Sequence, residues 1–188
     1  MRNLIGSVTL LVAVGAASCA RAPVPVARER VEPQAAKAEA AIGALRAKLL
    51  TRVTEVMGQD GPQKAIEVCS TEAVALTAQI GREQGVELGR TSFRVRNPAN
   101  APRAWAAETV NAAAGLKAAD ARPALFDLGD RVGVLQPMPV GAVCVTCHGA
   151  QLEPGIAEAV KARYPDDRAT GFAEGDLRGF FWAEVPRG

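Results

Sequence analysis

One short string, Cys144-Val145-Thr146-Cys147-His148, constrains this chain more than any other feature and contains its only histidine. Cys-x-x-Cys-His is the attachment sequence of c-type haem. Its two thiols form thioethers with the porphyrin vinyl groups, and its imidazole binds the iron. Cysteines three residues apart share one face of a helical turn. We therefore expect one covalent haem c, attached through Cys144 and Cys147, with His148 as an axial ligand of the iron.

Two other interpretations of this string, a redox dithiol and a zinc site, fit less well. A thioredoxin-like Cys-x-x-Cys belongs near a βαβ pattern, and none precedes it here. A zinc site takes four ligands, and beyond the N-terminal segment the chain offers only Cys69, Cys144, Cys147 and His148. Neighbours such as Cys147 and His148 rarely bind one tetrahedral ion together. With one histidine, the sixth iron ligand is another residue, water or nothing.

The N-terminal residues have the pattern of an export signal. Arg2 precedes an apolar stretch, residues 4–17, that is too short to span a bilayer. Small residues then lead to Cys19 as in a bacterial lipobox, although Ala16 stands where leucine is usual. We expect a signal peptide over residues 1–18 and a lipidated Cys19, which places the protein on the periplasmic side of the outer membrane. Ordinary signal cleavage would instead give a soluble periplasmic protein.

The remaining sequence divides into a tether and one domain. Residues 19–33 contain prolines and mixed charge, which is typical of a linker. Residues 34–188 are sufficient for a single c-type haem domain with a hydrophobic core. The net charge of +2 is small and the basic residues are scattered. We therefore expect no nucleic-acid partner, and membrane contact only through the lipid anchor.

The spacing of apolar residues predicts an α+β fold, with helices first and strands later. Pro137 and Pro139 are expected to end the strand that precedes the haem motif. The predicted helices cover residues 34–57, 62–81, 102–117 and 154–163, and the predicted strands cover residues 86–95, 124–128, 132–136 and 176–185.

One cysteine remains after the haem and the export signal are assigned. Cys69 lies on the apolar stripe of the second predicted helix, so it should face the core. An unpaired thiol in an oxidising compartment calls for an explanation. It is either a small buried hydrophobic residue or a ligand of the iron. Met57, Met138, a lysine and an open position are the alternatives for the sixth ligand.

Three arginines stand in or directly after the strand predicted over residues 86–95. Haem carries two propionates, which guanidinium groups bind in a bidentate manner. Arg90, Arg94 and Arg96 are therefore expected cofactor-binding residues, and Arg178 has the same potential. The alternative for each is solvation or pairing within the protein.

Several blocks of sequence are more specific together than the haem motif alone. They are Ala65–Cys69, Gly89–Pro102, Cys144–Gly149, Tyr164–Gly171 and Glu174–Gly179. In this order they resemble the exported single-haem c-type family formerly catalogued as a domain of unknown function. The chain departs from that pattern after Trp105, where members often carry an acidic residue and this chain has Ala106.

The resemblance implies a PAS-like antiparallel sheet with flanking helices and an N-terminal helical pair. It also implies His/Cys axial ligation, with Cys69 as the thiolate opposite His148. The implied function is low-potential electron transfer or redox sensing through an unidentified redox or signalling partner. A haem-based gas or ligand sensor is the alternative. We expect no enzyme activity, because the only histidine is committed to iron and is not free for acid–base chemistry.

Overall fold

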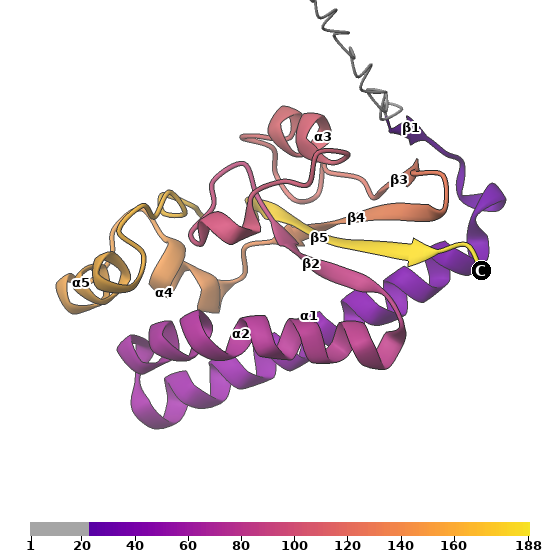
Figure 1. Ribbon diagram of the computed structural model, residues 1–188. Helices are drawn as coiled ribbons and strands as arrows, with labels where there is room; N and C mark the ends of the chain where they lie inside the picture. Colours follow the sequence, from indigo (N-terminus) through magenta and orange to yellow (C-terminus); the bar gives the residue numbers. More distant parts are fainter. Residues whose placement is uncertain (1–22) are drawn as a thin grey trace, which may run out of the picture.

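A helical hairpin lies along one face of the sheet (Figure 1). The computed structural model describes residues 23–188, and the hairpin consists of α1 (Glu32–Asp60) and α2 (Pro62–Gln84). Gly61 alone joins the two helices, and its φ of +84° is one that residues with a side chain rarely adopt. Pro62 then begins α2. The N–H of a first helical residue has no partner within the helix, so the missing N–H of proline costs no hydrogen bond there.

Both helices were predicted and both are longer than predicted. The sequence placed the end of the first helix before Gly58, but α1 continues through it. One glycine inside a helix costs only about 1 kcal/mol, which a packed helix tolerates. The second helix passes Gly81 and ends at Gly85, whose backbone is left-handed.

Five strands form one sheet in the order β1-β3-β4-β5-β2, and every neighbouring pair is antiparallel. The fold is therefore α+β with an N-terminal helical pair, as predicted. The strands are β1 (Val24–Pro25), β2 (Glu87–Thr91), β3 (Ala124–Asp127), β4 (Arg131–Pro139) and β5 (Leu177–Pro186).

The prediction that Pro137 ends the strand before the haem motif is wrong. β4 pairs with β5 through Pro137 and on to Pro139, with one irregularity after Met138. Its other neighbour, β3, reaches only to Leu135. Beyond Leu135 that edge of β4 is open, and a proline without an N–H can lie at an open edge.

The tether predicted over residues 19–33 differs from the structure. Val24 and Pro25 pair with β3, and Val31 is completely buried in the core. Val31 in the core and Val26 packed against it outweigh the prolines and charges of this segment, whereas Val24 is 45% exposed. The domain thus begins before residue 34. The predicted signal peptide and Cys19 lie outside the described residues.

The two largest hydrophobic clusters lie on opposite faces of the sheet. Between the hairpin and the sheet, Ile42 and Leu45 of α1 pack in one cluster with Val132 and Phe181. The opposite face is covered by α3 (Ala107–Ala112) and its neighbours (Figure 1).

The helix predicted over residues 102–117 is reduced to α3. Gly115 has a φ of +85°, and the indole of Trp105 donates to Glu184 while its ring packs against Phe126. The backbone angle of Gly115 and the contacts of Trp105 hold the residues on either side of α3 in turns.

At one end of the sheet, β4 continues into the short helices that contain the haem motif. These are η3 (Ala142–Cys144) and α4 (Val145–His148), followed by α5 (Pro154–Arg163) as predicted. Two further short helices are η1 (Arg28–Arg30) and η2 (Pro98–Asn100). In residues 23–188 no helix combines the length and the hydrophobicity needed to cross a membrane.

Candidate functional site

The attachment string forms a tight helical turn. Cys144 ends η3, while Cys147 and His148 lie in α4. Both cysteines are free thiols and half-buried. Gly149 must follow, because a Cβ there would lie 2.5 Å from the carbonyl oxygen of Val145. The fold thus presents both thiols and the imidazole from one compact turn.

His148 is held in one tautomer by the backbone. Its Nδ1 lies 2.6 Å from the carbonyl oxygen of Ala169. A carbonyl only accepts, so Nδ1 carries the proton and Nε2 keeps the lone pair that a metal needs. Burial, and then the charges of Arg178, Arg96 and Arg90, lower the pKa of His148 to about 3. The imidazole is therefore neutral at physiological pH, as ligation requires.

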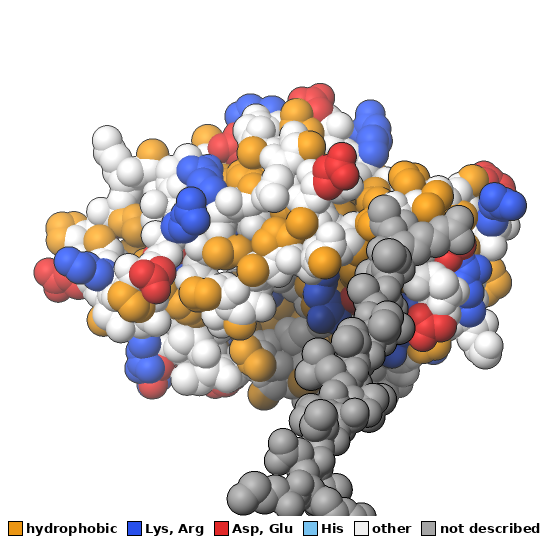
Figure 2. Space-filling model, turned by 45° about the horizontal axis from the view of Figure 1, so that its top comes forward, with side chains coloured by type: hydrophobic (Ala, Val, Ile, Leu, Met, Phe, Trp, Pro, Cys, Tyr) orange, Lys and Arg blue, Asp and Glu red, His pale blue; other side chains and the backbone are white. Residues whose placement is uncertain are grey.

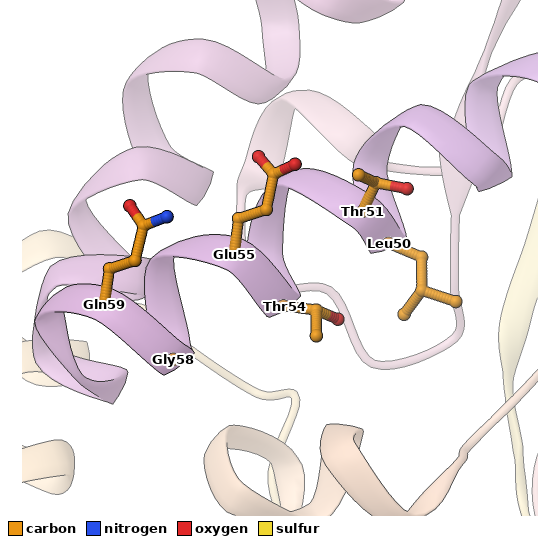
Figure 3. Close-up of a pocket in the computed structure, with 6 residues that line it drawn as sticks. All are labelled: Leu50, Thr51, Thr54, Glu55, Gly58 and Gln59. Carbon is orange, nitrogen blue, oxygen red and sulfur yellow. The ribbon is translucent and has the colours of Figure 1, made fainter.

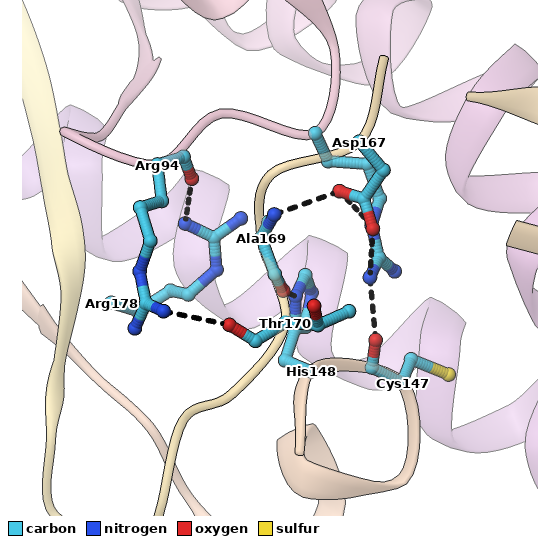
Figure 4. Close-up of polar contacts among 8 residues, drawn as sticks. Arg94, Cys147, His148, Asp167, Ala169, Thr170 and Arg178 are labelled. Atoms are coloured by element: carbon cyan, nitrogen blue, oxygen red, sulfur yellow. Dashed lines mark hydrogen bonds and ion pairs between the residues drawn. The ribbon is translucent and has the colours of Figure 1, made fainter. Parts of the chain in front are cut away.

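The segment that holds His148 is itself fixed by an ion pair (Figure 4). Arg96 donates from Nε and Nη2 to the two carboxylate oxygens of Asp167, each at 3.1 Å. Its Nη2 also donates to the carbonyl oxygen of Cys147 at 2.5 Å. The side chains of Arg96 and Asp167 are only 12% and 7% exposed. For Arg96 the structure thus shows the alternative to a propionate contact, pairing within the protein.

Arg94 and Arg178 gather over one aromatic ring. Their guanidinium carbons lie 3.8 Å and 5.1 Å from the ring centre of Phe172. Arg94 donates to the carbonyl oxygen of Thr170 at 2.8 Å, and Arg178 donates to the carbonyl oxygen of Arg94 at 3.0 Å. Burial lowers the pKa of Arg178 to about 10, which still leaves it charged at neutral pH. Neither arginine has a carboxylate partner among residues 23–188.

Arg90 is also left without an acidic partner. No hydrogen bond or ion pair joins its guanidinium to any other described residue. Burial lowers its pKa, and the side chains whose charges act on it are Cys69 and Tyr164. A guanidinium in this setting is unfavourable unless an anion comes to it.

Cys69 lies on α2 within the electrostatic reach of the same site. Burial raises the pKa of its thiol, and the positive charges of Arg90 and Arg96 offset part of this rise. Cys147 packs against the cluster that contains Ile66, which lies one turn before Cys69 on α2. Within residues 23–188 the thiol makes no hydrogen bond. The fold thus packs α4, which carries Cys147, against the part of α2 that carries Cys69.

The other two sulfur candidates have packing roles. Met57 packs against the cluster of Val56, Ala65 and Val68, and Met138 packs against the core between the hairpin and the sheet.

Sequence reasoning missed Asp167 and the carbonyl of Ala169, although both stand in a quoted block. Tyr164 packs against an apolar cluster of Ile66, Ile156 and Val160. Asp176 accepts the backbone N–H of Ala173 at 2.7 Å.

Two surface hollows lie away from this site. One, of about 440 Å³, is formed by a single face of α1 between Leu50 and Gln59 (Figure 3). The other, of about 730 Å³, lies beside α3 and includes Trp105 and Phe126. On the face shown in Figure 2, acidic and basic side chains of the described residues are interspersed and form no continuous basic patch.

Among the residues described, no three His, Cys, Asp or Glu side chains gather as a metal bound by protein alone requires. The zinc interpretation therefore lacks its ligand set. Haem iron needs fewer protein ligands, because the porphyrin supplies the equatorial nitrogens.

A family model of the Tll0287-like proteins matches residues 24–186, almost the whole described chain. The protein belongs to the Tll0287-like family. The crystal structure of the cyanobacterial heme-protein Tll0287 is similar, with a TM-score of 0.59 and 24% sequence identity over 87% of this chain and 98% of that one. This likeness shows a shared fold. No curated protein matches the chain.

Proposed function

We propose that this Tll0287-like protein is a haem protein, with one haem c attached covalently to Cys144 and Cys147. The observation that carries the proposal is the geometry of His148. Its Nδ1–H is bound to Ala169, so Nε2 is left for iron directly beside two unbonded cysteines. The haem-protein relative with the same fold supports this assignment.

The charges around the site fit a dianionic group. Four arginines act on His148 or on the segment that holds it: Arg90, Arg94, Arg96 and Arg178. Asp167 pairs with one of them, Arg96. Arg96 uses this carboxylate, so Arg90, Arg94 and Arg178 retain surplus positive charge. The two haem propionates would compensate for it through charge-assisted hydrogen bonds. We assign Arg90 and Arg94, with Arg178, to that role, while Arg96 acts at the neighbouring backbone.

We further propose that Cys69 would hold the iron of the haem together with His148. When bound, the haem supplies a one-electron iron couple. A thiolate at Cys69 would compensate for the charge of ferric iron and lower the reduction potential, which suits a low-potential carrier or a redox sensor. Its place on α2 one turn after Ile66, against which Cys147 packs, supports this role. The alternative function is gas or ligand sensing by the same haem.

The cellular setting belongs to the proposal as well. The apolar N-terminal sequence and Cys19 support export and a lipid anchor on the periplasmic side, with a redox or signalling protein as the partner. Ordinary cleavage to a soluble periplasmic form is the alternative. We propose no enzyme activity. Stopped-flow electron transfer, compared with CO and NO binding spectra, would distinguish a carrier from a sensor.

Covalent attachment tests the central part of this proposal. The full chain, produced with the c-type maturation machinery, should keep its haem in denaturant, because thioethers survive unfolding and axial bonds do not. Changing Cys144 and Cys147 together to Ala should leave the haem extractable or absent. Cys69→Ala is the matched control and should keep the haem covalently bound. Haem that stays bound in the denatured double variant would contradict the assignment.

A further inference from the structure

Two hydrogen bonds made by Ala169 place a carboxylate close to the imidazole of His148. Asp167 Oδ1 accepts the backbone N–H of Ala169 at 2.9 Å. The carbonyl of the same residue accepts the Nδ1–H of His148 at 2.6 Å. The two bonds fix Ala169 between the carboxylate and the imidazole, so the charge of the carboxylate lies close to His148 and acts on it through space.

The arginine that pairs with this carboxylate reaches the other side of the same turn. Arg96 binds both oxygens of Asp167 and also the carbonyl of Cys147, the residue before His148. Backbone bonds from Gly171 to Gly149 and from Phe172 to His148, both at 2.9 Å, join the two segments further along. The pair therefore connects the attachment turn to the segment that orients the histidine.

We propose that Arg96 and Asp167 are positioning residues that orient His148 and set the reduction potential of the bound haem. This inference rests on the proposed haem function. Because both side chains are almost completely buried, their charges are weakly screened. The intact pair is close to neutral, so removing either partner leaves a net charge beside the iron ligand.

The two partners should act in opposite directions. Asp167→Asn leaves the positive charge of Arg96 unpaired close to the iron ligand, which destabilises ferric iron. Arg96→Gln leaves a negative charge near the ligand, which stabilises ferric iron. A pair that served only to hold the loop would give shifts of the same sign, because disorder does not depend on which charge is lost.

The experiment measures the midpoint potential and the ferric EPR spectrum of the haem-loaded full chain. We expect a positive shift for Asp167→Asn, a negative shift for Arg96→Gln, and a potential close to wild type for the double variant. Altered EPR g-values in the single variants would report the orientation of the imidazole.

A second aspartate offers a matched control. Asp127 also accepts an N–H two residues ahead, from Gly129 at 2.9 Å, and also pairs with an arginine, Arg187 at 3.0 Å. Its side chain is 47% exposed, compared with 7% for Asp167. Asp127→Asn should therefore leave the potential and the EPR spectrum unchanged.

Two results would overturn the inference: single variants that shift the potential in the same direction, and single variants that do not shift it. If Arg96→Gln does not mature with haem, Arg96→Lys replaces it, since lysine keeps the charge and loses the two-point contact. Arg96→Lys should change the EPR spectrum with a potential shift under half that of Asp167→Asn, and an equal shift would contradict the account. A wild-type protein without covalent haem would defeat the proposed function itself, a different outcome from haem with an unmoved potential.

Discussion

The two sides of the proposed iron site differ in how the protein holds its ligand. His148 donates to a backbone carbonyl in a segment fixed by the Arg96–Asp167 pair. Cys69 projects from a long helix, and within residues 23–188 its thiol makes no hydrogen bond. Burial acts on both, lowering the pKa of the imidazole and raising that of the thiol.

This difference indicates that one side of the site is preorganised and the other is adaptable. A ligand with a fixed tautomer and orientation binds iron without rearrangement. A buried thiol is neutral until a cation compensates for its anion, so its bond should depend on the iron oxidation state. We therefore expect His148 to remain bound in both states and ligand exchange to occur at the Cys69 position.

The largest expected effect concerns acid stability in protein without haem, such as the Cys144→Ser/Cys147→Ser variant. The pKa of His148 is about 3 in the fold, compared with about 6.5 for an unfolded histidine. Because the unfolded state takes up the proton first, the free energy of unfolding should fall as the pH decreases from about 6.5 to 3. The loss should reach at most roughly 5 kcal/mol.

Urea unfolding at a series of pH values measures this change. Holoprotein should lack this dependence, because iron occupies the imidazole. An equal slope with and without haem would show that His148 is not the ligand. For Cys69 the sign is opposite, because its raised pKa favours the fold below the unfolded thiol pKa and loses that contribution at alkaline pH.

The next effect concerns the ion pair on the His148 side of the site. Asp167→Ala leaves Arg96 buried and unpaired, and removing one partner of a buried pair costs about 3–5 kcal/mol. The matched change at the exposed pair, Asp127→Ala, should cost less than about 1 kcal/mol. Denaturant unfolding of the two variants side by side measures both values. Equal losses would mean that the Arg96–Asp167 pair contributes no more than a surface pair.

Sequence and structure agree where local pattern decides the outcome. The limits of α5 and the motif at Cys144–His148 follow from helix spacing and short-range chemistry. Partner-dependent features could not be inferred in this way. Pro137 remains in β4 because β3 stops short, and Arg96 turns to Asp167, which lies 71 residues further along the chain.

A smaller effect tests the surplus charge near Cys69. Arg90→Met removes a guanidinium that has no carboxylate partner among the described residues and keeps its apolar stem. Haem-free protein should gain about 1 kcal/mol of stability, because replacing buried charge by an apolar group is often stabilising. Haem-loaded protein should instead lose stability as a propionate loses its partner. Thermal unfolding with and without haem measures both, and shifts of the same sign would remove Arg90 from the haem site.

The central claim, a haem between a fixed His148 and an adaptable Cys69, is tested most directly by ferric EPR combined with redox titration of wild type and Cys69→Ala. We predict a low-spin, thiolate-type spectrum and a low potential for wild type. Cys69→Ala should give a high-spin or water-ligated spectrum and a higher potential, because the charge donated by the thiolate is lost. Met57→Leu and Met138→Leu should change neither. A Cys69→Ala protein with unchanged spectrum and potential would contradict the account and leave Cys69 as a packing residue of α2.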